Sequence, residues 1–295
     1  MIKLTQIVAL CIFCCILLAI KALDSGKYQN DLAERNLKGK VKLCIEFVYH
    51  EPKINDTIDT GWVYKTISSF DLKGKSQSWY LCDGAPNYRT EMAMTSSYDK
   101  EGREVDTKDS LGKIISRSTY NRNAENNLIE SYWSELSSKP MFKIIYNHFG
   151  RRDSMYCYNI AGGFMGTVIY RYNKSNDMIE ELRYSRNSKL TGKEIYYYNK
   201  TNLKISEMHY DSLGTKTGKM TYAYDDYGNM IMEIDSNNMY IGGERVFSVD
   251  PNNKDILIFK CSYGNFDNHH NWLREDMFYN NKIVKTFKRK IDYYP

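Results

Sequence analysis

Alternating apolar and polar residues dominate the chain beyond residue 40, and this alternation predicts strands rather than helices. In TYAYDDYGNMIMEID, Thr221–Asp235, the first two tyrosines share one side of an extended chain and the alanine between them takes the other. After the D-x-x-G-N turn, the apolar residues of MIMEID alternate with Glu233 and Asp235. Asp, Asn and Gly between two alternating runs are typical of a hairpin turn. The segment predicts a β-hairpin whose acids are turn residues or outward-facing strand residues.

This hairpin is one copy of a repeat. A tyrosine of the Y-x-Y-[DN] type recurs every 26 residues and serves as the repeat anchor, at Tyr120, Tyr146, Tyr172, Tyr198 and Tyr224. Two further series keep the same period, one of tyrosines at 132, 158, 184 and 210 and one of glycines at 166, 192 and 218. A fixed period in three series indicates a repeated structural unit. Each unit holds two turns and two strands.

The repeat predicts how the hairpins associate. An isolated hairpin is marginally stable in water, so neighbouring units must pair edge to edge. Their tyrosines are then expected to form a shared aromatic seam on one face. Anchor-like residues recur with more drift at Phe70, Tyr98 and Phe266, and Val41–Tyr49 has the pattern of an opening strand. The predicted fold of residues 41–295 is all-β: consecutive antiparallel hairpins forming one long, twisted and curled sheet.

The first 40 residues differ from the rest. Residues 1–22 have a lysine at position 3 and an uncharged apolar run from Ile7 to Ile20, as in a secretory signal peptide. A short membrane anchor that is retained is one alternative. A lipoprotein is another, because Cys11, Cys14 and Cys15 lie in this segment, although no good lipobox precedes any of them. Residues 23–40 are polar and predict a tether or short helix. The expected location is the periplasm, the cell surface or the medium.

One segment interrupts the repeat. The anchor after Tyr224 is due at Asp250, which is followed by Pro251 and fits no tyrosine anchor. Residues 236–256 therefore hold an insertion. Extra surface residues cost little closure entropy, so a plain long loop is one interpretation. Long loops on rigid scaffolds also carry function, and the alternative is a contact with a partner through the apolar residues of this loop, Tyr240, Ile241, Val246 and Phe247.

Composition narrows the chemistry. The chain has 26 Tyr and only 5 Pro, which favours strands. The net charge is +5, and removal of residues 1–22 would take away two lysines. So small a positive charge in an exported chain argues against nucleic-acid binding. None of the remaining cysteines belongs to a C-x-x-C pair, so a zinc site is not expected, and their disulfide state stays open: Cys44, Cys82, Cys157 and Cys261.

The stretches YAYDDYGNM, YDSLG and FDNHHNWLREDMFYNNKIVKTFKRKIDYY resemble the YD-repeat, or RHS-like, sequences of exported proteins in Bacteroides and related bacteria. Phe266, Asp267, Asn271 and Trp272 match the terminal form of that repeat, and His270 stands where glycine is usual. The resemblance implies a hairpin-repeat fold over most of residues 41–295. Large RHS proteins build a spiralling shell around a toxin, and that role is not expected to carry over to this much shorter chain.

Catalytic motifs are weak. His269 and His270 beside Asp267 could bind a metal, but they occupy a repeat turn. GTKTGKMT has methionine where a phosphate loop needs Ser or Thr, and AGGFMG lacks a dinucleotide fingerprint. We therefore expect no catalytic, metal or cofactor residues. Paired acids for glycoside hydrolysis stay open, because a distance across the fold defines them.

Three hypotheses for function follow. The first is an exported non-enzymatic repeat protein, either a binding module or a scaffold of the cell envelope, with a glycan or a protein as partner and no membrane span after signal cleavage. The second is a glycan-directed hydrolase with its site in a groove of the sheet. The third is a fragment or relative of an RHS-type toxin system.

Overall fold

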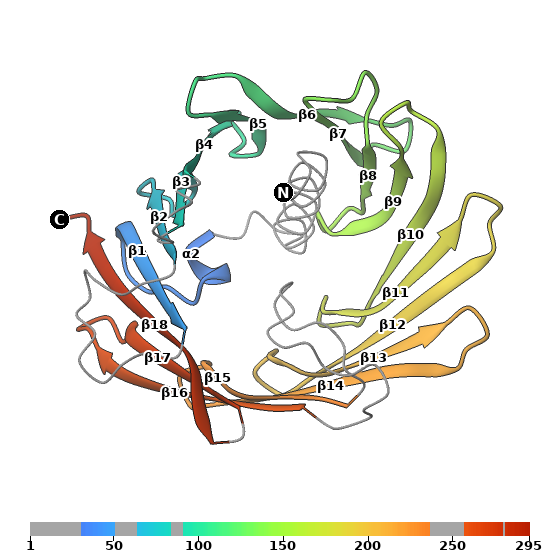
Figure 1. Ribbon diagram of the computed structural model, residues 1–295. Coiled ribbons are helices and arrows are strands. Elements are labelled where there is room, and N and C mark those ends of the chain that lie inside the picture. Colours follow the sequence, from blue (N-terminus) through green and yellow to red (C-terminus); the bar gives the residue numbers. More distant parts are fainter. Residues whose placement is uncertain (1–30, 51–63, 84–90, 237–256, 280) are drawn as a thin grey trace, which may run out of the picture.

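A computed structural model describes residues 31–50, 64–83, 91–236, 257–279 and 281–295. These residues form a short helix, α2 (Asp31–Glu34), and a succession of strands (Figure 1). The strands are β1 (Val41–His50), β2 (Tyr64–Phe70), β3 (Ser76–Asp83), β4 (Glu91–Tyr98), β5 (Glu104–Asp109), β6 (Ile114–Arg122), β7 (Leu128–Ser134), β8 (Phe142–Tyr146), β9 (Arg152–Tyr158), β10 (Phe164–Tyr172), β11 (Met178–Ser185), β12 (Leu190–Tyr198), β13 (Lys204–Asp211), β14 (Lys216–Tyr224), β15 (Met230–Asp235), β16 (Leu257–Phe266), β17 (Trp272–Tyr279) and β18 (Lys282–Tyr293).

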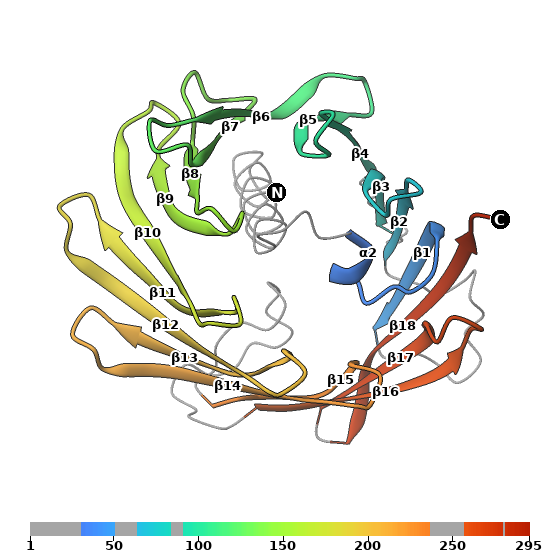
Figure 2. The ribbon, with the colours of Figure 1, turned by 180° about the vertical axis from the view of Figure 1, so that it is seen from behind.

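The sheet closes into a barrel. Every strand pairs antiparallel with the next, and β18 pairs back onto β1 from Tyr293 opposite Val41 to Lys285 opposite His50. Figures 1 and 2 show the resulting ring from its two sides. The prediction of an open, twisted and curled sheet is therefore wrong, although its all-β antiparallel hairpins are present. Closure removes both sheet edges, whose unpaired N–H and C=O groups would otherwise face solvent. A repeat pattern specifies neighbouring pairs only, so it does not reveal this last pairing.

A single turn geometry recurs around the barrel. The first residue donates its N–H to the carbonyl four positions later, and the N–H three positions later returns to the first carbonyl, as between Asp225, Gly228 and Asn229. The fourth residue has positive φ, which favours Gly or Asn. At this position His270 has φ 61°, where the repeat usually has glycine. The carboxylate of Asp225 also accepts N–H bonds from Tyr227 at 2.9 Å and Asn229 at 2.8 Å, so the turn residues are specified by sequence.

The two faces of the barrel can be assigned from α2. Leu32 and Leu37 pack against Val41, Cys44 and Phe70, and both views place α2 inside the ring (Figures 1 and 2). Cys44 and Phe70 therefore point inward. Directly opposed residues of neighbouring strands share a face, so the ladder carries this assignment from strand to strand around the barrel.

This assignment corrects the predicted direction of the acids. Glu233 lies opposite Tyr222, and both face inward, whereas Met232 and Ile234 face outward. Glu233 is 8% exposed and Asp235 is 0% exposed. The prediction assumed one apolar core that excludes charge. The inward face instead combines tyrosines with charged residues that pair with one another.

Tyrosine hydroxyls tie successive hairpins together. Tyr198 on β12 donates to the carbonyl of Met178, the first residue of β11, at 2.8 Å. Tyr224 on β14 repeats this contact with Lys204, the first residue of β13, at 2.8 Å. Three more tyrosines bond in the same way to the first residue of the preceding strand: Tyr98 to Ser76, Tyr120 to Glu104 and Tyr263 to Met230. The contact gives the tyrosine period a physical reason, because each hydroxyl joins one hairpin to the one before it.

The segment before β1 lies along the rim that carries these turns. Asn36 donates to Asn229 Oδ1 at 2.6 Å, and the backbone of Lys38 exchanges hydrogen bonds with the Asn271 amide at 2.7 and 2.9 Å. The described part of the predicted tether is thus bonded to the turns after β14 and β16. No helix in the described ranges is long and apolar enough to cross a membrane.

Candidate functional site

The inward face of β12 and β13 carries a linked set of charged side chains. His209 lies between two carboxylates, with Nδ1 3.2 Å from Glu194 Oε1 and Nε2 3.4 Å from Glu207 Oε1. Lys204 Nζ lies 2.5 Å from Glu207, and Arg183 pairs with Glu194. The side chains of Glu194, Glu207 and His209 are 11–14% exposed. We call these five residues the inner ionic network.

Tyrosines complete the inner ionic network. The hydroxyl of Tyr196 donates to Glu194 Oε2 at 2.6 Å. Lys204 Nζ lies 5.5 Å from the ring centroid of Tyr196 and 5.1 Å from that of Tyr222. Burial, reinforced by the charges of Glu194 and Glu207 respectively, raises the pKa of both phenols. These tyrosines therefore stay protonated and act as hydrogen-bond donors at neutral pH.

Mutual pairing fixes the charge state of the network. Hydrogen bonds to Glu194 and Glu207 raise the pKa of His209 to about 9, against the effect of partial burial. Burial alone would raise the pKa of Glu194, but the His209 hydrogen bond and the Arg183 charge outweigh it and lower the pKa to about 2. The same competition lowers the pKa of Glu207. At neutral pH His209 is a cation between two carboxylates.

A second inward group lies where the barrel closes. Arg289 has its guanidinium carbon 3.4 Å from the ring centroid of Trp272, and its Nε lies 2.8 Å from Glu46. The Trp272 ring also contacts Tyr263, with 5.6 Å between centroids. Nearby, burial raises the pKa of Glu275, and the charge of Glu46 adds to that effect. We call Trp272 and Arg289 the inner pair, and both its indole and its guanidinium contact further side chains.

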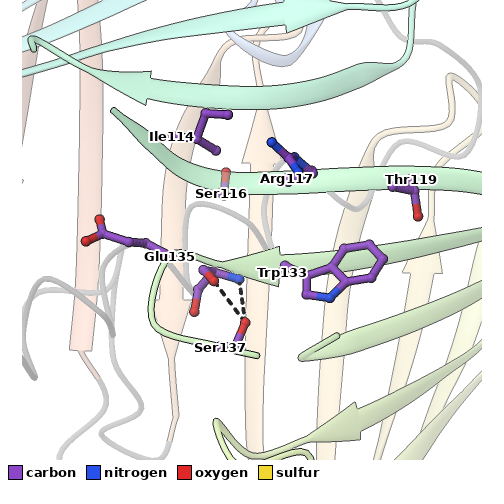
Figure 3. A pocket seen from close by; sticks show the side chains of 8 residues that line it. Ile114, Ser116, Arg117, Thr119, Trp133, Glu135 and Ser137 are labelled. Atoms are coloured by element: carbon purple, nitrogen blue, oxygen red, sulfur yellow. Dashed lines mark hydrogen bonds between the residues drawn. The ribbon is translucent and has the colours of Figure 1, made fainter. Parts of the chain in front are cut away.

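The outward face carries a different tryptophan–arginine pair. Trp133 on β7 lies directly opposite Arg117 on β6. Their neighbours Ser118 and Tyr132 oppose each other on the inward face, so the pair points outward. Figure 3 shows Trp133 and Arg117 on adjacent strands, with strands of the opposite wall behind them. They line a shallow pocket of about 320 Å³, the outer pocket, together with Ile114, Ser116, Thr119, Ser134, Glu135 and Ser137.

The two central side chains of the outer pocket, Arg117 and Trp133, make no polar contact in the described structure. Within the described residues, Arg117 has no hydrogen bond or ion pair, and the Trp133 indole has no hydrogen bond or ring contact. The neighbouring acids have lysines of their own: Glu135 pairs with Lys113, and Asp106 Oδ1 lies 3.8 Å from Lys108 Nζ. Asp106 lies directly opposite Arg117 in the ladder but forms no described ion pair with it, so no carboxylate is bonded to the Arg117 guanidinium among the described residues.

The residues singled out from sequence are scattered through this architecture. The anchor tyrosines 120, 146, 172, 198 and 224 all face inward, around the barrel rather than at one site. Phe266 is 41% exposed and lies 6.0 Å, centroid to centroid, from Tyr227. His269, His270 and Asp267 form a turn, and no metal-binding cluster occurs among the residues described. Cys44, Cys82, Cys157 and Cys261 are free thiols. Tyr240, Ile241, Val246 and Phe247 lie outside the described residues.

Sequence reasoning did not identify Trp133 and Arg117. A signal was present in SYWSELSSKP, because the tyrosine before Trp133 belongs to a repeat series. If that tyrosine faces inward, alternation places Trp133 outward. The partner on β6 was not visible, because it depends on the pairing register.

Comparisons with known proteins find no matching family model and no significantly matching curated protein. Similar solved structures include a porin-like protein from Bacteroides uniformis, 9% identical, covering 86% of this chain and 99% of that one with a TM-score of 0.45. A porin-like protein from Bacteroides vulgatus is 10% identical, with coverages of 73% and 98% and a TM-score of 0.39. A chain of the TcdB2-TccC3-Cdc42 complex is 12% identical, covering 76% of this chain but 12% of its own length, with a TM-score of 0.30. At these values the similarity assigns neither family nor function.

Proposed function

We propose that this chain is an exported, non-enzymatic scaffold of the cell envelope that binds a partner on the outward face of its barrel. The observation that carries the proposal is the contrast between the two faces. The charges of the inner ionic network are all paired, with Glu181 as a further partner of Arg183, whereas the outer pocket has an arginine and a tryptophan without a described hydrogen bond, ion pair or ring contact. Export rests on the signal-like residues 1–22.

The charge states of the inner acids support a structural role for the network. General acid catalysis needs a carboxyl group that is protonated near the working pH. The bases around Glu194 and Glu207 lower the pKa of both carboxyl groups instead. These two acids therefore suit a fixed ion-pair network better than an acid–base pair.

The experiment is a binding screen with the purified protein on arrays of glycans and envelope proteins. We expect saturable binding to at least one class of envelope component, without turnover of that component. If the protein binds no component on any of the arrays, the proposed binding role is wrong.

A hydrolase is the second candidate, and Glu275 is the residue that favours it. Its pKa is raised by burial, and Glu46 lies close enough to add to the shift. Glycoside hydrolysis uses a pair of carboxyl groups, of which the general acid has a raised pKa. Release of reducing ends from a polysaccharide panel, abolished by Glu275→Gln, would favour this candidate, and the absence of release would remove it.

A further inference from the structure

We propose that the outer pocket binds a single acidic sugar unit of an anionic glycan, with the Trp133 indole under the pyranose ring and the Arg117 guanidinium on its carboxylate. This inference rests on the proposed function and names the ligand class for its outward face. It is argued from the size of the pocket, the chemistry of its two principal residues and the charges around it.

Size limits the occupant to a small group. Ligand pockets run from about 300 to 1,000 Å³, and the outer pocket, at about 320 Å³, is near the lower end. Most of its lining comes from the paired strands β6 and β7, with Glu135 and Ser137 from the segment after β7, so the pocket is largely preformed. One sugar ring fits this scale better than a folded protein segment, which needs a much larger contact area.

The two central side chains match an acidic sugar. An indole offers a broad apolar face with an N–H donor at its edge, which suits one face of a pyranose ring. A guanidinium offers a planar fork of donors that matches a carboxylate bidentately. Because Arg117 and Trp133 are directly opposed across the ladder, both groups can contact one ligand at once.

The remaining lining suits hydroxyl groups. Thr119, which shares the outward face with Arg117, has no side-chain hydrogen bond in the described structure, so its hydroxyl is available to a sugar. Ser137 is already used: its Oγ donates to the Ser134 carbonyl at 2.9 Å and accepts the Ser134 N–H at 3.0 Å, which fixes the lip of the pocket (Figure 3).

Local electrostatics selects an anion. Glu135 pairs with Lys113, and Asp106, which lies directly opposite Arg117 and 3.8 Å from Lys108, forms no described ion pair with the Arg117 guanidinium. A neutral sugar would leave the guanidinium without a partner, whereas a carboxylate would gain charge-assisted hydrogen bonds. The geometry therefore points to uronic-acid-type units rather than neutral hexoses.

The test is a titration of the purified full-length protein with oligosaccharides from polygalacturonate, alginate, hyaluronan and polysialic acid. Each is paired with its carboxyl-reduced form, and binding is followed by calorimetry. We expect at least one acidic oligosaccharide to bind and its carboxyl-reduced form to bind at least tenfold more weakly. The reason is that hydrogen bonds to a charged group are lost when the carboxylate is reduced, and such a loss typically lowers affinity by this factor or more.

Variants separate this inference from the broader function. We expect Arg117→Gln to weaken binding at least tenfold and Trp133→Ala to abolish it, with unfolding midpoints nearly unchanged because neither side chain makes a described hydrogen bond or ion pair. Arg171→Gln is the matched control. Arg171 also faces outward, but it pairs with Glu180 at 2.8 Å and lies on β10, several strands away from the outer pocket. If acidic glycans do not bind, or bind equally to Trp133→Ala, the inference is wrong. Binding of another envelope component would then leave the proposed function standing.

Discussion

The barrel contains two tryptophan–arginine pairs in opposite conditions. On the inward face Arg289 lies over Trp272 and is bonded to Glu46, so both members have partners. On the outward face Arg117 and Trp133 are neighbours across a ladder, and neither has a described partner. The comparison shows that residue type does not decide whether a pair is structural or available to a ligand. The side of the wall decides it, together with whether a carboxylate is bonded to the guanidinium, as Glu46 is to Arg289 and Asp106, opposite Arg117, is not.

The largest expected effect comes from breaking the inner pair. Arg289→Ala removes a guanidinium whose side chain is 10% exposed and leaves Glu46 without its cation. Removing one partner of a largely buried ion pair typically costs 3–5 kcal/mol, and we expect about 3 kcal/mol here because Glu46 is 25% exposed. Urea unfolding monitored by circular dichroism measures the loss. A loss below about 1 kcal/mol would mean that the inner pair is not structural.

Two adjacent tyrosines provide a matched version of the same comparison. Tyr198 faces inward and bonds to the Met178 carbonyl, whereas Tyr197 faces outward and is 43% exposed. We expect Tyr198→Ala to lower the free energy of unfolding by about 2–4 kcal/mol. Tyr197→Ala should change it by less than about 1 kcal/mol, as surface substitutions usually do. Equal losses in the two variants would contradict the assignment of faces.

The inner ionic network predicts a pH dependence. The folded-state pKa of His209 is raised from 6.5 to about 9, so its contribution to stability is complete below pH 6.5 and is lost as pH rises through 9. The side chain is 12% exposed, and after allowance for solvent screening the contribution is on the order of 1–2 kcal/mol. Unfolding measured from pH 6 to 9.5 should show this decline.

His209→Gln is the control for that decline. Glutamine can keep one hydrogen bond but carries no charge, so the variant should be less stable at pH 6 and should show a flatter profile up to pH 9.5. A variant that declines as steeply as the parent would assign the alkaline loss to another group.

The smallest stability effect is expected at the outer pair. Arg117→Gln and Trp133→Ala break no described interaction, so each should change the free energy of unfolding by no more than about 0.5 kcal/mol. The same urea titration used for Arg289→Ala measures both. A loss of about 2 kcal/mol in either variant would show that the outer pair supports the wall, which would weaken its interpretation as a binding pocket.

The sequence predicted the local structure well and the global structure less well. Turn residues such as Asp225 and Gly228 identify hairpins because their backbone requirements are local. Closure depends on a pairing between Val41–His50 and Lys282–Tyr293, the two ends of the sheet, and no local pattern reports it. The acids at 233 and 235 were assigned to the wrong face, because alternation alone does not say which face is inward.

The candidate site was less predictable than the fold. The inner ionic network joins Arg183 on β11 with His209 on β13, and the outer pocket joins Arg117 with Trp133 across two strands. Each depends on the exact register of the ladder, which bulges shift by one residue at some turns, such as those that join β11 to β12 and β12 to β13, and not at others, such as the turn between β6 and β7. Periodicity locates strands but does not fix that register.

Hydroxyl-radical footprinting of the native protein, read by mass spectrometry, tests the difference between the two faces most directly. Trp272 is 6% exposed and Tyr196 is 8% exposed, whereas Tyr197 is 43% exposed and Trp133 lines an open pocket. The account predicts fast labelling of Trp133 and Tyr197 and protection of Trp272 and Tyr196 until the protein unfolds. Labelling of Trp272 as fast as Trp133, together with equal labelling of the two adjacent tyrosines, would contradict it.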